Sequence, residues 1–239
     1  MVAPILAAGA CQTVGVDRSG ADRRARLHDA HLYFVADRAG LGHALEGALR
    51  GGADLVQLRD KDASDEEIAA AAAWTRERCA AHGALFILND RPDLAVAVGA
   101  DGVHVGQDDM PVAEARAIVG DERIVGLSTH SIEQAEAGAR SGADYIAVGP
   151  VHATPTKEGR PPIGLAPVRH AAAHVGGLPW FAIGGIDRET VGAVAAAGAR
   201  RAVVVRAIAQ AEDPEAAARE LRAALAGRGA ALGAGRGAP

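Results

Sequence analysis

The chain has 239 residues, of which 49% are hydrophobic and only 3% aromatic, and its formal net charge is −5. This length suits one α/β barrel with a core built from Ala, Val, Leu and Ile. Lys and Arg are scattered rather than gathered in a basic run, which argues against a nucleic-acid-binding protein and leaves room for a small anionic ligand held locally.

The two cysteines indicate a reducing compartment, and the apolar N-terminal segment does not have the pattern of a signal peptide. Cys11 and Cys79 are far apart and have no partner at metal-ligand spacing, so neither a disulfide framework nor a zinc site is supported. Residues 2–10 are apolar, but they lack a preceding basic region and are too short for a signal core or a membrane span. We therefore expect a cytoplasmic protein with no membrane partner.

Composition divides the chain into three segments. Residues 1–29 have no periodic apolar face and are expected to form a disordered N-terminal extension. Residues 30–226 are expected to form one catalytic domain. Residues 227–239 consist mainly of Gly and Ala and form a tail with too little side-chain surface to pack.

Between the two ends, eight apolar runs bounded by turn residues predict strands, and a helix-like interval follows each one. The predicted strands cover residues 32–37, 54–59, 84–90, 101–105, 123–128, 144–149, 179–184 and 200–207. The predicted helices cover residues 41–50, 65–81, 92–98, 111–119, 132–141, 165–173, 188–197 and 214–225. Several helices begin after a Ser or Asp cap or with Pro in the first turn.

This order predicts a parallel sheet, and eight units predict its closure into a (β/α)8 TIM barrel. A doubly wound open sheet is the alternative, but no strand is followed by a Gly-x-Gly-x-x-Gly turn. The helix-to-strand joints repeat as Gly-Ala-Asp at residues 52–54, 99–101 and 142–144, where Gly supplies a left-handed helix stop. The polar clusters follow the strands at the other end, where barrel enzymes place their chemistry.

The first polar cluster follows the second predicted strand. Gln57, Arg59 and Lys61 are two residues apart, so in a strand they share one face. Inward-facing polar residues of a barrel strand need partners, which favours a cationic wall at the barrel mouth. The alternative is that Arg59 and Lys61 are solvated charges.

Acidic residues follow the third and fourth predicted strands. Asn89 and Asp90 follow the third strand, and Asp108 and Asp109 follow the fourth. Mg²⁺ needs only one or two protein carboxylates when substrate phosphate completes its shell. The alternative is that these residues cap turns and helices, and the spacing does not choose between Asp108 and Asp109.

Three further segments follow strands at the same end of the barrel. Thr154, Thr156 and Lys157 lie in a connection of about fifteen residues, which is long for a strand-to-helix loop and makes it a candidate lid. Gly184-Gly185 follows the seventh strand and Val205-Arg206 follows the eighth, where barrels often bind phosphate through backbone N–H groups. His104 is expected to point inward, either as a buried hydrogen-bonded residue or as a catalytic one.

Several motifs in the same order carry a resemblance to a known family. They are residues 56–61 (VQLRDK), 88–91 (LNDR), 102–109 (GVHVGQDD), 126–128 (GLS), 149–151 (GPV), 154–157 (TPTK) and 182–186 (AIGGI). Over residues 32–225 the chain resembles the thiamine-phosphate synthase family, also called thiamine-phosphate pyrophosphorylase. The resemblance implies a (β/α)8 transferase that joins 4-amino-5-hydroxymethyl-2-methylpyrimidine diphosphate to a thiazole phosphate, releasing pyrophosphate by a dissociative path.

The same resemblance implies a role for each site residue. Those expected to bind the pyrimidine diphosphate are Gln57, Arg59, Lys61, Asn89, Ser128 and Lys157, with Arg59, Lys61, Ser128 and Lys157 assisting catalysis. Asp90 and Asp109 would bind Mg²⁺, which selects Asp109 over Asp108. Those expected at the thiazole phosphate are Thr154, Thr156, Gly185, Val205 and Arg206. Arg206 departs from the family pattern, in which a serine is expected.

Two rival functions remain. A thiazole tautomerase of the same barrel family would transfer a proton and would not need the diphosphate site. A non-catalytic phosphate-binding barrel is the other rival. The expected partners are the two small substrates, and the sequence leaves open whether the protein forms a homo-oligomer.

Overall fold

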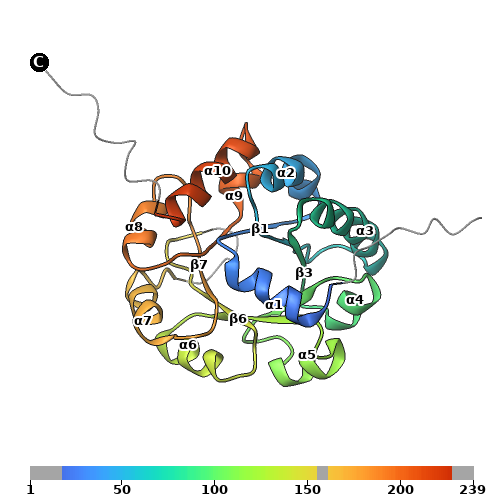
Figure 1. Cartoon of the computed structure of the whole chain (residues 1–239), viewed down its shortest axis with the longest axis horizontal. Helices are drawn as coiled ribbons and strands as arrows, with labels where there is room; N and C mark the ends of the chain where they lie inside the picture. The colour runs from blue at the N-terminus through green and yellow to red at the C-terminus, as the bar shows by residue number, and fades with distance from the viewer. Residues whose placement is uncertain (1–17, 155–160, 228–239) are drawn as a thin grey trace, which may run out of the picture.

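The computed structural model describes residues 18–154 and 161–227, and in it eight parallel strands form a closed barrel in sequence order. Figure 1 shows the helices as a ring around the strands, with one further helix, α1, across an opening of the barrel. Closure is direct, because Leu32, Tyr33 and Phe34 of the first strand pair with Ala202, Val203 and Val204 of the last. The predicted TIM barrel is therefore confirmed, and the open sheet is excluded.

The elements follow the predicted order. The strands are β1 Leu32–Ala36, β2 Leu55–Leu58, β3 Leu85–Asn89, β4 Gly102–Val105, β5 Ile124–Thr129, β6 Tyr145–Val148, β7 Trp180–Ile183 and β8 Ala202–Val204. The helices are α1 Gly20–Asp29, α2 Arg38–Arg50, α3 Asp65–His82, α4 Pro92–Ala97, α5 Val112–Val119, α6 Ile132–Ala139, α7 Ala166–His174, α8 Val191–Ala196, α9 Arg206–Ala209 and α10 Pro214–Leu225. The last strand is shorter than predicted because Arg206 already begins α9.

The core has two layers, one on each side of the strands. Outward-facing strand residues pack against the helices in a large cluster of Ala, Val, Leu and Ile, as predicted. The barrel interior holds a separate cluster that includes Tyr33, Tyr145 and Phe181. The three rings meet edge to face with centroids 5.5–5.9 Å apart. Three of the chain's few aromatic residues are thus concentrated inside the barrel.

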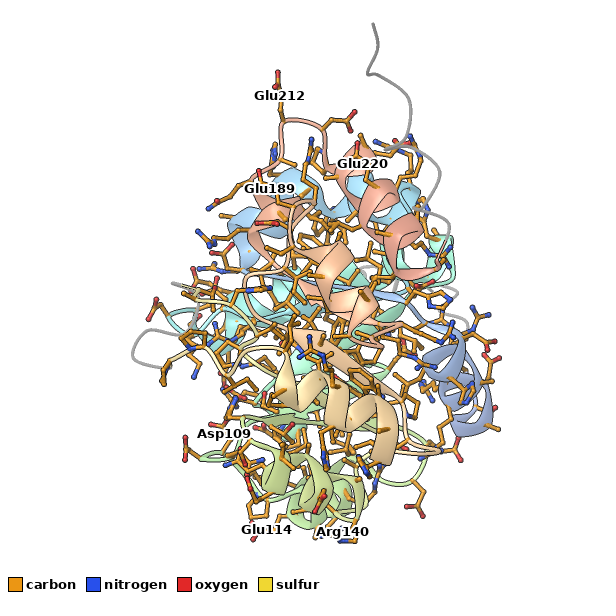
Figure 2. All side chains as sticks on the ribbon, turned by 90° about the vertical axis from the view of Figure 1, so that its left-hand side faces the viewer. Asp109, Glu114, Arg140, Glu189, Glu212 and Glu220 are labelled. Atoms are coloured by element: carbon orange, nitrogen blue, oxygen red, sulfur yellow. The ribbon has the colours of Figure 1, made fainter. Side chains whose placement is uncertain are left out.

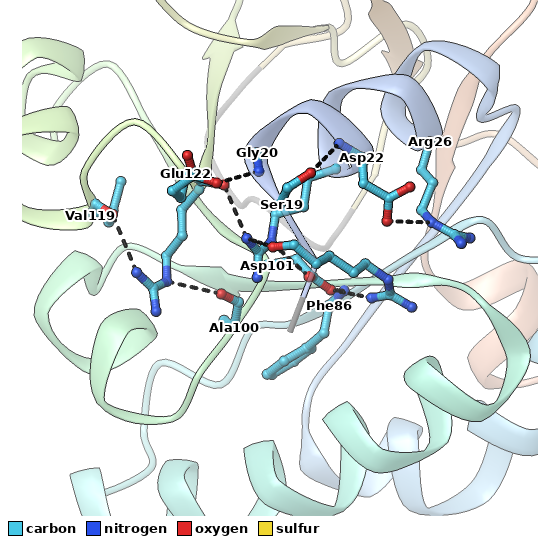
Figure 3. A network of polar contacts seen from close by, with 12 residues as sticks. Ser19, Gly20, Asp22, Arg26, Phe86, Ala100, Asp101, Val119 and Glu122 are labelled. Carbon is cyan, nitrogen blue, oxygen red and sulfur yellow. Dashed lines mark hydrogen bonds and ion pairs between the residues drawn. The ribbon is translucent and has the colours of Figure 1, made fainter. Parts of the chain in front are cut away.

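The expectation of a disordered extension over residues 1–29 is wrong for residues 18–29, which end in the helix α1. Ser19 caps this helix, and Leu27 is buried with the inner core. The docking includes ion pairs, since Arg18 and Arg23 each lie 2.9 Å from a carboxylate oxygen of the buried Asp101. Figure 3 shows Asp101 within the network of polar contacts around the start of α1. Residues 1–17 and 228–239 lie outside the described residues, so the rest of that expectation stays untested.

Asp101 belongs to one of the three Gly-Ala-Asp joints, and the aspartates of these joints share one structural role. The carboxylate of Asp54 accepts the backbone N–H of Leu32 at 3.0 Å, and that of Asp101 accepts the N–H of Phe86 at 3.0 Å. Asp144 accepts the N–H of Val125 at 2.8 Å. Each aspartate therefore satisfies an amide at the start of the preceding strand, and this end of the barrel is structural. Along the described ranges, no helix is long and apolar enough to cross a bilayer.

Candidate functional site

A cavity of about 510 Å³ lies where the strands run into the following loops and helices. Its lining includes predicted site residues from six strand ends, namely Gln57, Arg59, Asn89, Ser128, Thr154, Gly185, Val205 and Arg206. A small adjoining cavity is lined by Lys61, Asp90 and Asp109, and it shares Arg59, Asn89 and Ser128 with the large one. The structure thus brings these predicted residues together, whereas Thr156 and Lys157 fall outside the described residues.

The three residues of the predicted wall differ in how far they are exposed to solvent. Gln57 is buried at the end of β2, Arg59 is half-buried, and Lys61 is exposed. The Nζ of Lys61 lies 3.7 Å from a carboxylate oxygen of Asp90, and the Lys61 side chain is 57% exposed. Such a loose, solvated pair leaves the ammonium free to rotate toward a bound anion.

The two acids predicted to bind a metal stand next to each other. Asp90 follows β3 with φ 59°, a left-handed backbone that few non-glycine residues adopt. Its N–H donates to the carbonyl of His104 at 2.8 Å, which fixes Asp90 against β4. Asp109, labelled in Figure 2 on the side of the molecule opposite to α1, accepts the N–H of Gly106 at 2.8 Å.

Burial, and then the nearby carboxylate of Asp109, raises the pKa of Asp90 above its usual value. Two carboxylates in contact repel each other once both are ionised, so a cation between them would be stabilising. Asp109 lines the small cavity with Asp90, and Asp108 is not part of that lining. The described ranges contain no group of three or more His, Cys, Asp or Glu residues suited to a metal ion.

A chain of buried hydrogen bonds joins two of the predicted binding residues through the barrel interior. Gln57 donates to the Tyr33 hydroxyl, which lies 2.9 Å from the Tyr145 hydroxyl. His104 lies between Tyr145 and Ser128, with 2.9 Å from Nδ1 to the Tyr145 Oη and 2.9 Å from Nε2 to the Ser128 Oγ. His104 is therefore inward and hydrogen-bonded, as one of the two sequence interpretations expected. Tyr33 and Tyr145 were not predicted, although both stand in strands where an alternate residue must face inward.

The loops after β6 and β7 touch each other beside the large cavity. Gly184 and Gly185 have φ values of 102° and 60°. A Cβ on Gly185 would lie 2.7 Å from the Cβ of His152, and one on Gly184 would lie 2.4 Å from the Cα of Pro150. Both positions therefore need glycine, and the backbone of this turn lies close to the segment that leads to Thr154.

Comparison with known proteins agrees with the arrangement of the site. A family model described as thiamine monophosphate synthase matches residues 32–208. The chain belongs to this family. Thiamine-phosphate synthase of Thermobifida fusca is 52% identical over 213 residues, covering 87% of this chain and 98% of that protein. Thiamine-phosphate synthase of Saccharopolyspora erythraea is 51% identical over 213 residues, covering 84% and 96%.

Solved structures with a similar fold include one enzyme of the same family and one with a different activity. Thiamine phosphate pyrophosphorylase from Pyrococcus furiosus superposes with a TM-score of 0.75 and 35% identity, covering 84% of this chain and 96% of that one. A 3-hexulose-6-phosphate synthase superposes with a TM-score of 0.59 at 23% identity, which shows only the shared barrel. The resemblance read from the motifs is confirmed.

Proposed function

We infer that this chain is a transferase that makes thiamine phosphate from 4-amino-5-hydroxymethyl-2-methylpyrimidine diphosphate and a thiazole phosphate, releasing pyrophosphate. The observation that carries this inference is the adjoining pair of cavities, whose lining combines cations, two carboxylates and a glycine turn at one end of the barrel. The near-complete coverage of the Thermobifida fusca synthase supports it.

The diphosphate is proposed to occupy the mouth of the barrel above β2 and β3. Arg59, Lys61 and Asn89 line the small cavity with Ser128, and they would hold its oxygens by charge and hydrogen bonds. Gln57, deeper in the large cavity, would contact the pyrimidine ring. Lys157 belongs to this group by the family pattern.

Mg²⁺ is the proposed cofactor, held by Asp90 and Asp109. The donor set fits, because Mg²⁺ takes one or two carboxylates and completes its shell with water and phosphate oxygens. The pKa of Asp90 is raised because burial and the carboxylate of Asp109 outweigh the opposing effect of Lys61, so a further cation at the two acids would be stabilising. When bound, the ion would neutralise part of the charge on the diphosphate.

The thiazole phosphate is proposed to bind on the opposite side of the large cavity. Thr154, Gly185, Val205 and Arg206 line that side, and Thr156 joins them by the family pattern. The tight turn at Gly184-Gly185 lets backbone N–H groups approach an anion closely.

The residues of the site favour departure of the leaving group over activation of a nucleophile. The thiazole nitrogen already bears a lone pair, so no general base is needed. Arg59 and Lys61, with Lys157, would stabilise the negative charge that grows on pyrophosphate as its C–O bond breaks. Ser128 and Gln57 would hold the pyrimidine ring while it spreads the resulting positive charge, and the cavity would keep the two rings in contact.

The tautomerase alternative is weaker, because a proton transfer on a thiazole has no use for the cationic wall or for the Asp90–Asp109 pair. A non-catalytic phosphate-binding barrel would not need the carboxylates either. A cytoplasmic location and binding of two small molecules, with no nucleic-acid or membrane partner, complete the proposal. Self-association into a homo-oligomer is left to measurement.

The test is to incubate purified protein with both substrates and Mg²⁺ and to measure thiamine phosphate and pyrophosphate in equal amounts. The thiazole substrate incubated alone separates the alternatives, because a tautomerase would isomerise it without the pyrimidine. Isomerisation with no thiamine phosphate would reject the proposed function.

A further inference from the structure

The five residues Gln57, Tyr33, Tyr145, His104 and Ser128 form one continuous buried chain. All are buried, with exposed fractions between 0% for Tyr145 and 7% for His104. They come from five strands, β2, β1, β6, β4 and β5, so the chain crosses the barrel interior. Its two ends, Gln57 and Ser128, both line the large cavity.

The chain depends on a glycine in β5. A Cβ added to Gly126 would lie 2.1 Å from Cζ of Tyr145 and 2.4 Å from its hydroxyl oxygen. No side chain larger than hydrogen can therefore occupy position 126 while Tyr145 reaches His104. The Tyr145 ring also stacks on His104, with centroids 5.5 Å apart. Packing thus holds the hydroxyl in line with the imidazole.

The contacts of the chain fit one continuous direction of donation that begins at Gln57. The Gln57 amide nitrogen can only donate, so the Tyr33 hydroxyl accepts from it. Either hydroxyl of the Tyr33–Tyr145 contact could be the donor, and in the continuous direction it is Tyr33. In the same direction Tyr145 donates its own proton to Nδ1 of His104. Burial raises the pKa of Tyr33 and of Tyr145, so both phenols keep these protons.

The same direction extends to the last member. With Nδ1 of His104 accepting, an imidazole that carries one proton holds it on Nε2 and donates it to the Ser128 oxygen. In this arrangement the hydroxyl proton of Ser128 is not used toward His104. The chain then leaves an O–H donor at Ser128 and a carbonyl acceptor at Gln57.

We propose that Tyr33, Tyr145 and His104 are positioning residues that set this direction, so that the cavity presents a donor from Ser128 and an acceptor from Gln57 to the pyrimidine ring. The inference rests on the proposed function for the identity of the ring. An aminopyrimidine is the matching partner, since its amino group donates and its ring nitrogen accepts. An oxopyrimidine has the opposite pattern at the same two atoms, and a site of fixed direction rejects it because buried polar groups would be left unpaired.

The direction is measured on the free wild-type enzyme by ¹⁵N NMR of labelled histidine, with His104 assigned by the loss of its signals in His104→Asn. The expected result is a protonated Nε2 and an unprotonated Nδ1. The opposite tautomer would mean that Ser128 donates to His104 and would overturn the proposal. This readout needs no substrate, so it is independent of whether thiamine phosphate is the product.

The positioning role is measured with Tyr145→Phe, which keeps the ring and removes the hydroxyl. The KM for the pyrimidine diphosphate should rise about tenfold, the loss expected for one or two buried hydrogen bonds, while the KM for the thiazole phosphate stays within about twofold. The matched control is Phe181→Leu, which disturbs the same aromatic cluster without touching the chain and should not separate the two constants. Equal changes in both constants would reduce Tyr145 to a packing residue and overturn the proposal.

Two further measurements connect the chain to its ends. Tyr145→Phe combined with Ser128→Ala should lose less than the sum of the two single effects, because Tyr145 acts through Ser128. Full additivity contradicts the proposal.

Replacing the 4-amino group of the diphosphate substrate with oxo should weaken binding at least 100-fold in the wild type, and equal binding of both compounds would also contradict the proposal. Absence of thiamine phosphate synthesis with the expected His104 tautomer would instead reject the proposed function.

Discussion

Arg59 and Arg140 differ in their position relative to the two cavities. Arg59 lines both cavities, whereas Arg140 is exposed at the end of α6 and is absent from both linings. Arg59→Ala should lower kcat/KM by a factor on the order of 100, because it would remove the proposed preorganised contact to the leaving group. Steady-state kinetics measures this, with Arg140→Ala as the matched loss of one positive charge. Equal activity of the two variants would mean that Arg59 is only a solvated charge.

Asp108 and Asp109 test the proposed metal site within two neighbouring positions. Asp109→Asn keeps an acceptor for the Gly106 N–H and removes the charge beside Asp90. It should lower activity far more than Asp108→Asn, and it should raise the Mg²⁺ concentration needed for half-maximal activity. Mg²⁺ titrations of both variants measure the difference. Matching losses in the two variants would count against Asp109 as the ligand.

Arg206 is the one departure from the family pattern, and its replacement tests which of the two proposed phosphate sites it belongs to. Its side chain is exposed, yet it lines the large cavity at the start of α9. In Arg206→Ser the backbone N–H groups of the turn remain, so the KM for the thiazole phosphate should rise only a few-fold and the KM for the diphosphate should stay unchanged. A larger change in the diphosphate constant would exchange the assignment of the two sites.

At the scale of elements, the periodic pattern predicted the strands and their order because a buried parallel strand reads as an apolar run. It also placed the polar residues at one end, since each follows its strand directly. The helix α1 escaped prediction because it has no periodic apolar face, and its arginines pair with Asp101 and Asp144, more than 70 residues further along the chain. The Tyr33–Tyr145 contact escaped for the same reason, as spacing within a strand does not reveal which partner lies across a barrel.

The ionic docking of α1 makes a prediction about stability. Arg23→Ala should lower the free energy of unfolding by about 3 kcal/mol, because Asp101 is buried and loses one of its two arginine partners. Arg26 is the matched control, since it lies on the same helix and its side chain is 44% exposed in its pair with Asp22. Its replacement by Ala should have little effect. Urea unfolding of both variants measures the difference, and similar losses would show that α1 is held by its apolar residues instead.

At the scale of the whole molecule, ligand binding at the proposed Mg²⁺ site should change the stability of the fold. Asp90 and Asp109 would repel a diphosphate that shares their cavity, and a diphosphate would supply the oxygens that a cation between them still needs. Binding of each ligand should therefore depend on the other.

Melting temperatures in a two-by-two design, without the thiazole phosphate so that no turnover occurs, measure this dependence. Mg²⁺ alone or the pyrimidine diphosphate alone should change the melting temperature little. Both together, at about 100 times their dissociation constant, should stabilise the fold by about 2.7 kcal/mol, which corresponds to a rise of roughly 5–10 °C for a barrel of this size. In Asp90→Asn, where asparagine tolerates the left-handed backbone, this joint rise should largely disappear. A full rise with the diphosphate and excess chelator would show that the cations alone bind the substrate and that the two carboxylates hold no metal.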